Sequence, residues 1–362
     1  FMHLVIGLRD AKRGSWDKAL DNFTKMESSQ VNEILKPLLL GWSYLGKKDL
    51  PKARQNLLSL KKKRGFEILS LLHTALALQD QEKTSVVDKL LDEAIGSVEE
   101  TPSRLALTAA NYYQKTGRTG TAINLIDKIK SKDFNLEILK GGRRTAKGSS
   151  LSEVTVRSPQ DGISEALFDI ASALRDEYDN NASLIFVRLA SYIRPEFHSA
   201  QILLGEILEE RGKYPEAIKE FKQIPEESIF FRMAQLRLSQ TLRQDGKPRA
   251  AILVLERLKQ RQPKNAENFI RLGDIYRSQK DCDEAIFAYN TAINLTNRDS
   301  KSDWILYYSR GVALEQSGQW DMAEADFIKA LELAPNQPFI MNYLGYAWTC
   351  LLYTSPSPRD SF

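Results

Sequence analysis

The chain has 362 residues, of which 42% are apolar and 27% are charged, values that are typical of a folded protein. Its formal net charge of +4 is small for this length and by itself favours neither a nucleic acid nor a membrane surface as a partner. No apolar run approaches the ~18 residues that a transmembrane helix needs, so the sequence predicts no membrane span.

The first 130 residues carry a faint repeat. Gly7 and Gly41 are 34 positions apart, and Ala19 and Ala53 repeat the same distance. Small residues at a fixed spacing allow the axes of successive helices to approach closely. We therefore expect residues 1–130 to form an N-terminal block of about four degenerate helix pairs.

The repeat is interrupted between residues 131 and 162. This segment contains several residues that favour loops, namely Gly141, Gly142, Gly148, Pro159 and Gly162. We interpret residues 131–162 as a linker that separates the N-terminal block from a second block.

The linker also contains a basic cluster formed by Lys140, Arg143, Arg144 and Lys147. The order Lys147-Gly148-Ser149 differs from the Gly-Lys-Ser/Thr order of a phosphate-binding loop. Two interpretations remain open: a solvated loop, or a surface for an acidic partner or a nucleic acid. The solvated loop is favoured, because no aromatic residue that would stack on a base lies among the basic ones.

The repeat is strong from residue 163 to residue 349. A small residue recurs every 34 positions, and an alanine recurs in step with it. These positions are Ala171, Gly205, Ser239 and Gly273, with Ala217, Ala251 and Ala285. Gly212, Gly246 and Gly318 lie where a turn within each helix pair is expected. The pattern predicts a C-terminal block of five helix pairs followed by one truncated first helix.

The stretch Ala266–Asn297 displays the repeat most completely. One stripe on its first helix would carry Phe269, Leu272, Gly273 and Tyr276, and one on its second helix Ala285, Tyr289 and Ala292. Gly273 and Ala285 are small where the two helix axes must approach, and the aromatic side chains fill the space around them. This combination resembles the tetratricopeptide (TPR) repeat.

The resemblance covers residues 162 to about 348, and it implies an all-α fold: a right-handed superhelical solenoid of stacked antiparallel helix pairs. It also implies a non-enzymatic scaffold that binds a peptide or a partner protein in its concave groove. The run AEADFIKALELAPNQPFIMNYLGYAW is similar in style to long bacterial TPR-repeat proteins. Because such proteins often carry an export signal, a periplasmic location is slightly favoured over a cytoplasmic one.

Residues 350–362 interrupt the last repeat within a helix. The run Cys350 to Asp360 resembles a translated sequencing-library adapter, so we expect residues 350–362 to be a non-native tail. The alternative, a phosphorylated Ser-Pro linker, is disfavoured because such a linker should follow a completed helix pair.

The sequence predicts no catalytic, cofactor or metal site. His3, His73 and His198 lie in unrelated repeats without a companion metal-binding motif, so each is expected to be a solvated or core histidine. Outside the tail, Cys282 is the one cysteine, which supports neither a disulfide framework nor a thiolate metal site.

The candidate binding residues are those beside the core stripe on the first helices of the C-terminal block. Arg237 and Arg271 are one repeat apart, as are Arg243 and Arg277. The expected partner-binding groove consists of Arg237, Arg243, Arg271, Arg277, Ile270, Tyr308 and Val312. Four arginines in register predict a peptide or protein partner with acidic side chains.

Three alternatives bear on function. Some TPR domains hold a partner's terminal carboxylate with Lys and Asn residues, but the matching positions here are Ile202, Glu206, Ile270 and Asp274, which disfavours that role. The repeats can instead be the recognition arm of a larger enzyme, a transferase or a protease, whose catalytic domain lies outside this sequence. A repeat stack used for self-association is the third.

Overall fold

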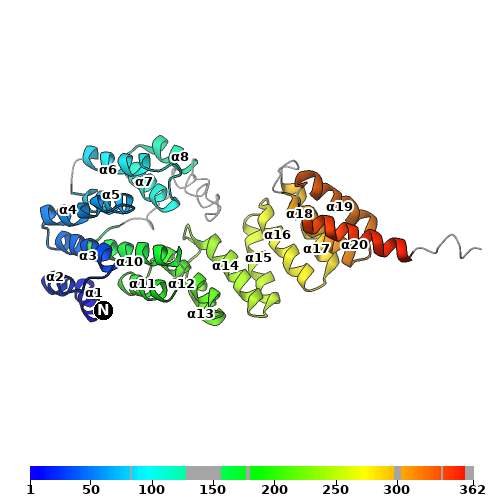
Figure 1. The fold of residues 1–362 in the computed structure, drawn as a ribbon, viewed down its shortest axis with the longest axis horizontal. Helices are drawn as coiled ribbons and strands as arrows, with labels where there is room; N and C mark the ends of the chain where they lie inside the picture. Colours follow the sequence, from blue (N-terminus) through cyan, green and yellow to red (C-terminus); the bar gives the residue numbers. More distant parts are fainter. Residues whose placement is uncertain (82–83, 128–155, 177–179, 297–302, 336, 355–362) are drawn as a thin grey trace, which may run out of the picture. The chain divides into compact units, whose positions relative to one another are not determined.

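The computed structural model describes residues 1–81, 84–127, 156–176, 180–296, 303–335 and 337–354 (Figure 1). These residues form α-helices and one short 3₁₀ helix, with no β-strand among them. Consecutive helices pack against each other in pairs, beginning with α1 on α2 and α3 on α4. The predicted all-α fold of stacked helix pairs is confirmed.

The chain forms two compact units, residues 1–237 and residues 238–362, and each is described by itself. The helices of the first unit are α1 Met2–Lys12, α2 Trp16–Thr24, α3 Asn32–Gly46, α4 Leu50–Ser59, the 3₁₀ helix Leu60–Lys62, α5 Glu67–Leu78, α6 Thr84–Gly96, α7 Ser103–Lys115, α8 Thr119–Asp127, α10 Pro159–Asp176, α11 Asn180–Ile193, α12 His198–Glu210 and α13 Tyr214–Lys222. Helix α14, Phe231–Gln244, contains the division between the units.

The second unit continues the same alternation of first and second helices. Its helices after α14 are α15 Pro248–Arg261, α16 Ala266–Ser278, α17 Cys282–Leu295, α18 Trp304–Gln316, α19 Trp320–Leu333 and α20 Pro338–Thr354. Helix α20 extends to Thr354, so the first residues of the expected tail continue this helix, and residues 355–362 lie outside the described residues. Among the described helices, none is long and apolar enough to cross a membrane.

Helices α16 and α17 cross where the sequence analysis places their small residues. A Cβ atom on Gly273 would lie 2.6 Å from the ring of Tyr289, and Ala285 is 0% exposed. Gly205 meets Phe221 and Gly311 meets Phe327 in the same way, with distances of 2.6 Å and 2.7 Å. Because the glycine on the first helix has no Cβ atom, the aromatic ring of the second helix can pack directly against the first helix.

The turns inside the helix pairs use the left-handed backbone region. Gly212, Gly246 and Gly318 have φ angles of +69°, +71° and +79°, as expected for a residue that ends a helix without a Cβ atom. Lys280 takes the same conformation between α16 and α17, with φ of 64°. The turn is thus set by the packing of the two helices, because a lysine adopts it where no glycine is available.

The start of α10 differs from the predicted linker. Ser158 and Asp161 form a reciprocal cap: the Asp161 carboxylate accepts the Ser158 amide at 3.1 Å, and the Ser158 hydroxyl accepts the Asp161 amide at 3.1 Å. Pro159 occupies the first helical position, where its missing N–H costs nothing. Pro159 and Gly162 are therefore helical, and the linker interpretation is wrong for residues 159–162.

The division at residues 131–162 is also absent from the packing of the described residues. Helix α10 packs against α3 and α5, which belong to the predicted N-terminal block. The division between the compact units falls within α14 instead. Residues 131–155, including the basic cluster Lys140–Lys147, lie outside the described residues.

Candidate partner-binding surface

In the second unit, the candidate residues lie on neighbouring first helices, α16 and α18, which contact each other. Helix α16 carries Ile270, Arg271 and Arg277, and helix α18 carries Tyr308; all four side chains are partly exposed. We call these four residues, with Asp274 of α16, the α16–α18 face. Ile270 and Tyr308 also contact the core of the unit, so each presents only part of its apolar surface.

Val312 does not belong to this face. It was expected in the groove but is 7% exposed and lies in the core with Phe327 and Leu314. Gly311, the residue before Val312, is the one that faces the Phe327 ring of the second helix. The apolar part of the face therefore consists of Ile270 and Tyr308.

Asp274 takes part in a hydrogen-bonded cluster with Tyr289 and Arg277 on this face. The buried hydroxyl of Tyr289, on α17, donates to the Asp274 carboxylate at 2.7 Å, and Arg277 Nε donates to the same hydroxyl oxygen at 3.3 Å. Burial raises the pKa of the Asp274 carboxyl, opposed by the Tyr289 hydrogen bond and by the charges of Arg277, Arg243 and Arg271. Burial also raises the pKa of Tyr289, with a further increase from the Asp274 charge.

The sequence analysis assigned Tyr289 to the core and missed this hydrogen bond. A signal was present: the equivalent aromatic positions are Phe221 and Phe327, so Tyr289 differs from them by a hydroxyl group. A buried tyrosine hydroxyl needs a partner, and the first helix is the nearest source of one.

Tyr289→Phe is expected to lower the free energy of unfolding of the second unit by about 1 kcal/mol at pH 7, the scale of one hydrogen bond in a partly solvated site. Without this donor the pKa of Asp274 rises further. Since a raised folded-state pKa of an acid costs stability above its unfolded value, the loss should shrink as the pH falls below the ordinary aspartate range. Urea unfolding at several pH values measures it.

Tyr276→Phe is the matched control, because within the described residues the Tyr276 hydroxyl has no hydrogen-bond partner. An equal loss in both variants would mean that the Tyr289–Asp274 bond contributes nothing specific.

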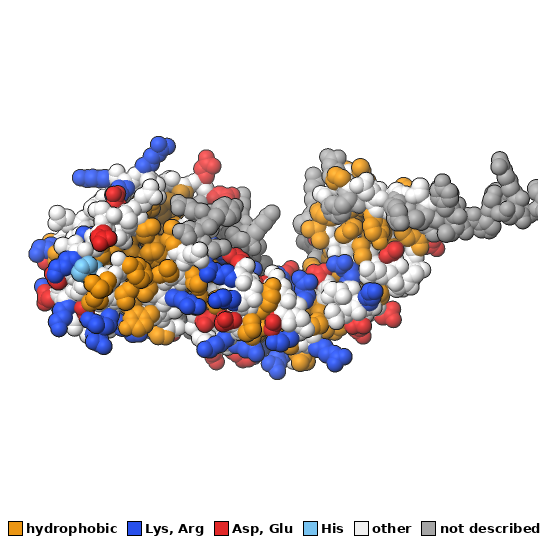
Figure 2. Space-filling view, turned by 60° about the horizontal axis from the view of Figure 1, so that its bottom comes forward, with side chains coloured by type: hydrophobic (Ala, Val, Ile, Leu, Met, Phe, Trp, Pro, Cys, Tyr) orange, Lys and Arg blue, Asp and Glu red, His pale blue; other side chains and the backbone are white. Residues whose placement is uncertain are grey.

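Most of the candidate arginines have acidic neighbours in their own chain. Arg271 donates to Glu267, one turn earlier on α16, at 2.6 Å. In the first unit, Arg237 of α14 lies 2.7 Å from Glu206 of α12, and Glu206 also pairs with Arg175 of α10 at 2.5 Å. Figure 2 shows Lys and Arg side chains interspersed with Asp and Glu on the visible face.

These pairs follow one spacing. Arg175, Glu206 and Arg237 are each 31 positions apart on successive first helices. In the second unit the same spacing relates Arg243 to Asp274, and the positive charge of Arg243 acts to lower the pKa of the Asp274 carboxyl. Neighbouring first helices thus carry opposite charges at facing positions. Arg237, Arg271 and Arg277 each lie within 4.0 Å of a carboxylate of their own chain, so an acidic partner would compete with these pairs.

Within the described residues, no cluster of three or more His, Cys, Asp or Glu side chains is placed to hold a metal ion. The three histidines lie apart: His3 contacts Asn22, His198 contacts Ser228, and His73 is fully buried in the first unit. Cys282 is a partly buried free thiol at the start of α17.

Stacked helix pairs, in which a small residue of the first helix packs against an aromatic ring of the second, are typical of one class of protein, the helical-repeat proteins. Within it, residues 197–306 match the family described as tetratricopeptide repeat-like domain, and residues 304–337 match the tetratricopeptide repeat itself. Together these matches cover residues 197–337 and support the resemblance of this part of the chain to tetratricopeptide repeats.

The human protein O-mannosyl-transferase TMTC1 is 27% identical to this chain over 142 residues, which is 39% of this chain and 16% of the human protein. The chain thus spans less than a fifth of that relative.

Solved structures with a similar fold include three proteins. A crystal structure of MamA is 25% identical and covers 46% of this chain and 94% of its own, with a TM-score of 0.40. YrrB, described as a TPR protein with an unusual peptide-binding site, is 16% identical over 50% of this chain and 91% of its own, with a TM-score of 0.39. The thermophilic TPR protein TTC0263 of Thermus thermophilus is 19% identical over 51% of this chain and 99% of its own, with a TM-score of 0.39.

Proposed function

We propose that this chain is a non-enzymatic scaffold that binds a peptide or a partner protein on the α16–α18 face. The observation that carries the proposal is the combination on one face of partly exposed apolar side chains, Ile270 and Tyr308, with two positioned arginines. Arg277 donates to the Tyr289 hydroxyl, which is itself bonded to Asp274, and Arg271 donates to Glu267. Preorganised charges beside an apolar surface lower the cost of ordering a partner.

The charged residues of this face would contribute more to the orientation of a bound acidic partner than to its affinity. Arg271 already donates its Nε to Glu267, so a partner carboxylate on the same guanidinium group would replace or share one partly exposed ion pair. Such pairs contribute ~0.2–1 kcal/mol each. The apolar contact with Ile270 and Tyr308 must therefore supply much of the affinity, while Arg243 and Arg277 set the direction of the peptide and its association rate.

The Arg271→Glu/Arg277→Glu variant is expected to bind at least tenfold more weakly to peptides that were selected on the wild-type protein from a random peptide library. Affinity of the wild type should also fall as salt rises, because exposed charges are screened. Fluorescence anisotropy of the labelled peptides measures both effects.

Arg249→Glu/Arg257→Glu is the matched control, with the same change of charge at exposed positions on the second helix α15. A variant with Lys140, Arg143, Arg144 and Lys147 changed to alanine tests the basic cluster. If the α16–α18 variant binds as the wild type does while the basic-cluster variant loses the peptides, the basic cluster is the binding site.

A second candidate is the recognition arm of a larger transferase. The match to a human O-mannosyl-transferase over 142 residues favours it. The complete open reading frame distinguishes the two: further helix pairs to its end support the scaffold, and an adjoining catalytic domain supports the enzyme. The same reading frame tests the proposed periplasmic location by the presence or absence of an export signal.

Self-association is a third candidate. Leu253 of α15 and Phe287 of α17 are 34 positions apart and are 63% and 67% exposed, which places apolar surface at equivalent positions on second helices. Light scattering on the full chain tests it, and a monomer at all concentrations contradicts it.

A further inference from the structure

Helix α10 packs on its own second helix α11 and on α3 and α5 of the N-terminal pairs, and single side chains link it to α1 and α7. Gln160 donates to the Ala11 carbonyl of α1 at 3.2 Å, and α10 also reaches Trp42 of α3, His73 of α5 and Arg104 of α7. Its residues 163–167 are all at most 2% exposed. A helix at the surface of a repeat stack keeps a solvated side. Residues 163–167 have none, because α11 covers one side of them, where the Ser164 hydroxyl donates to the Ala190 carbonyl at 2.9 Å, and the first helices of the N-terminal pairs cover another.

Gly162 allows α10 to pack closely against the indole ring of Trp42. A Cβ atom at position 162 would lie 2.1 Å from the Trp42 ring, a distance that no side chain tolerates. Trp42 is 0% exposed and cannot turn into solvent without leaving the core. The groove therefore requires a residue without a side chain at this point of the helix.

A chain of two hydrogen bonds then fixes Asp169 of α10. Trp42 Nε1 donates to His73 Nδ1 at 2.9 Å. Because an indole N–H only donates, His73 Nδ1 must accept, and the ring hydrogen lies on Nε2. Nε2 donates to Asp169 Oδ2 at 3.0 Å. Helices α3 and α5 together thus present one oriented donor to a carboxylate on α10.

Glu165 supplies the second carboxylate. Its side chain is 3% exposed and pairs with Arg104 of α7, while Arg194, which follows α11, lies 3.6 Å from the other carboxylate oxygen. The guanidinium groups of both arginines lie against the ring of Phe197, at 5.3 Å and 5.2 Å. A buried ion pair contributes little net stability compared with apolar packing, and its best-attested role is to select one register.

We propose that the inner face of α1, α3, α5 and α7 is a helix-binding groove that recognises an α-helix by three residues: a glycine, an acidic residue three positions later, and a second acidic residue four positions after that. Gly162, Glu165 and Asp169 occupy positions i, i+3 and i+7, which share one face of a helix. In this chain the occupant is α10, tethered by residues 128–155.

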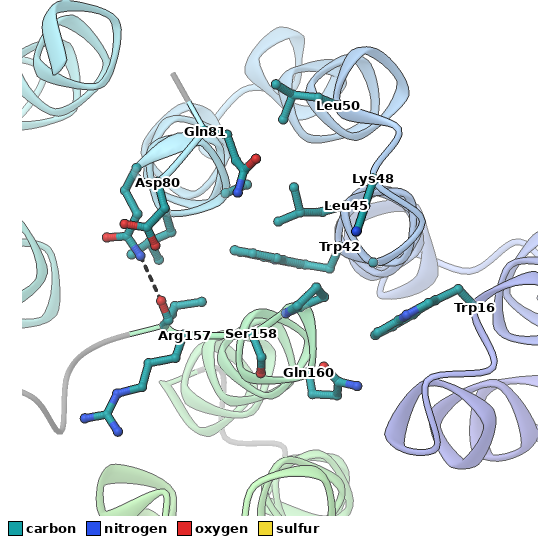
Figure 3. Close-up of a pocket in the computed structure, with 16 residues that line it drawn as sticks. Trp16, Trp42, Leu45, Lys48, Leu50, Asp80, Gln81, Arg157, Ser158 and Gln160 are labelled. Atoms are coloured by element: carbon teal, nitrogen blue, oxygen red, sulfur yellow. Dashed lines mark hydrogen bonds between the residues drawn. The ribbon is translucent and has the colours of Figure 1, made fainter. Parts of the chain in front are cut away.

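The groove extends beyond the start of α10. A cavity of about 590 Å³ adjoins residues 156–160 and is lined by Trp16, Trp42 and Leu45. Figure 3 shows the Trp42 side chain projecting between α10 and α5 and the Arg157 side chain directed away. Gln79 and Val156 also line the cavity, and the Gln79 amide donates to the Val156 carbonyl at 2.8 Å. A helix bound from another molecule therefore has room for residues that precede its first turn.

The test uses a labelled peptide of residues 156–175 and the full chain. A tethered segment has an effective concentration of ~mM, so micromolar peptide should not displace α10 from the wild type. In Gly162→Leu the chain's own helix no longer fits against Trp42, and this variant should bind the peptide at least tenfold more tightly than the wild type does. A peptide that itself carries Gly162→Leu should not bind.

Gly345→Leu is the matched control, because a Cβ atom there meets no neighbour; it should behave like the wild type. Circular dichroism, with hydrogen exchange in α1 to α8 and in α16 to α19, shows whether both units of each variant are folded. If Gly162→Leu does not fold, Asp169→Lys opens the same groove from a position whose side chain is 18% exposed. A folded variant that does not bind the peptide, or a wild type that binds both peptides equally, overturns the proposal.

Discussion

Arg104→Ala is expected to destabilise the first unit by about 3 kcal/mol, the cost of leaving one member of a buried ion pair without its partner. The Glu165 side chain is 3% exposed, and after the substitution its nearest cation is Arg194 at 3.6 Å, beyond hydrogen-bond distance. Burial raises the pKa of Glu165 and Arg104 lowers it, so removal of Arg104 raises this pKa further.

The loss should depend on pH. An acid whose folded-state pKa is raised binds more protons in the folded than in the unfolded state, so stability falls as the pH rises above its unfolded value. The difference between Arg104→Ala and the wild type should therefore be small below the ordinary glutamate pKa and grow above it. Urea unfolding from pH 4 upward measures this difference.

Two controls separate charge from packing. Glu165→Gln combined with Arg104→Ala should recover much of the loss, because a neutral amide does not need a cation. Arg118 pairs with Asp88, and its side chain is 35% exposed. Arg118→Ala should therefore lower the free energy of unfolding by at most ~1 kcal/mol. A loss in Arg104→Ala that does not change with pH, or that the double variant does not reduce, would show that Arg104 acts through its packing against Phe197.

The helix pairs were predictable because each is specified locally. Gly273 and Ala285 are separated by a few turns of helix and one tight turn, and their neighbours repeat the same pattern at a fixed period. The structure confirms both as sites of close approach. Gly212, Gly246 and Gly318 likewise act within their own turns.

The packing of α10 against the N-terminal helices was not predictable from that repeat pattern. His73 and Asp169 are 96 positions apart, and Gln160 and Ala11 are 149 apart, so no repeat period relates them. A repeat pattern predicts that each helix pair packs on the next pair along the chain. It does not predict whether a helix from a later pair also packs on earlier ones. One local signal was available: Ser158-Pro159-Gln160-Asp161 is a helix start. Pro159 and Gly162 led to its interpretation as a loop.

Helical periodicity placed Arg271 and Arg277 on the surface correctly, but it placed Val312 there wrongly and did not predict which charges pair. Arg271 and Arg277 lie on α16 beside the core stripe, where helical periodicity places them. Their acidic neighbours are set by side-chain geometry: Glu267 is one turn away, whereas Asp274 is held by a hydroxyl from another helix. Periodicity identifies which residues share a face and says nothing about which of them pair.

Gly273→Leu is expected to destabilise the second unit by about 3 kcal/mol, although leucine is the better helix former by ~0.8 kcal/mol. Already the first added atom, the Cβ, would lie 2.6 Å from the Tyr289 ring. Tyr289 cannot move aside cheaply, because it is 0% exposed and its hydroxyl is bonded to Asp274. The overlap must therefore separate α16 from α17.

The separation should spread to the nearest neighbours first, because repeats contact only adjacent ones. Hydrogen exchange should accelerate in α16 and α17, then in α18, which packs on α17. The Gly273→Leu/Tyr289→Ala double variant returns the volume of the ring, so the two single losses should not add. Additive losses, or unchanged exchange in α17, would mean that Gly273 does not set the distance between the two helices.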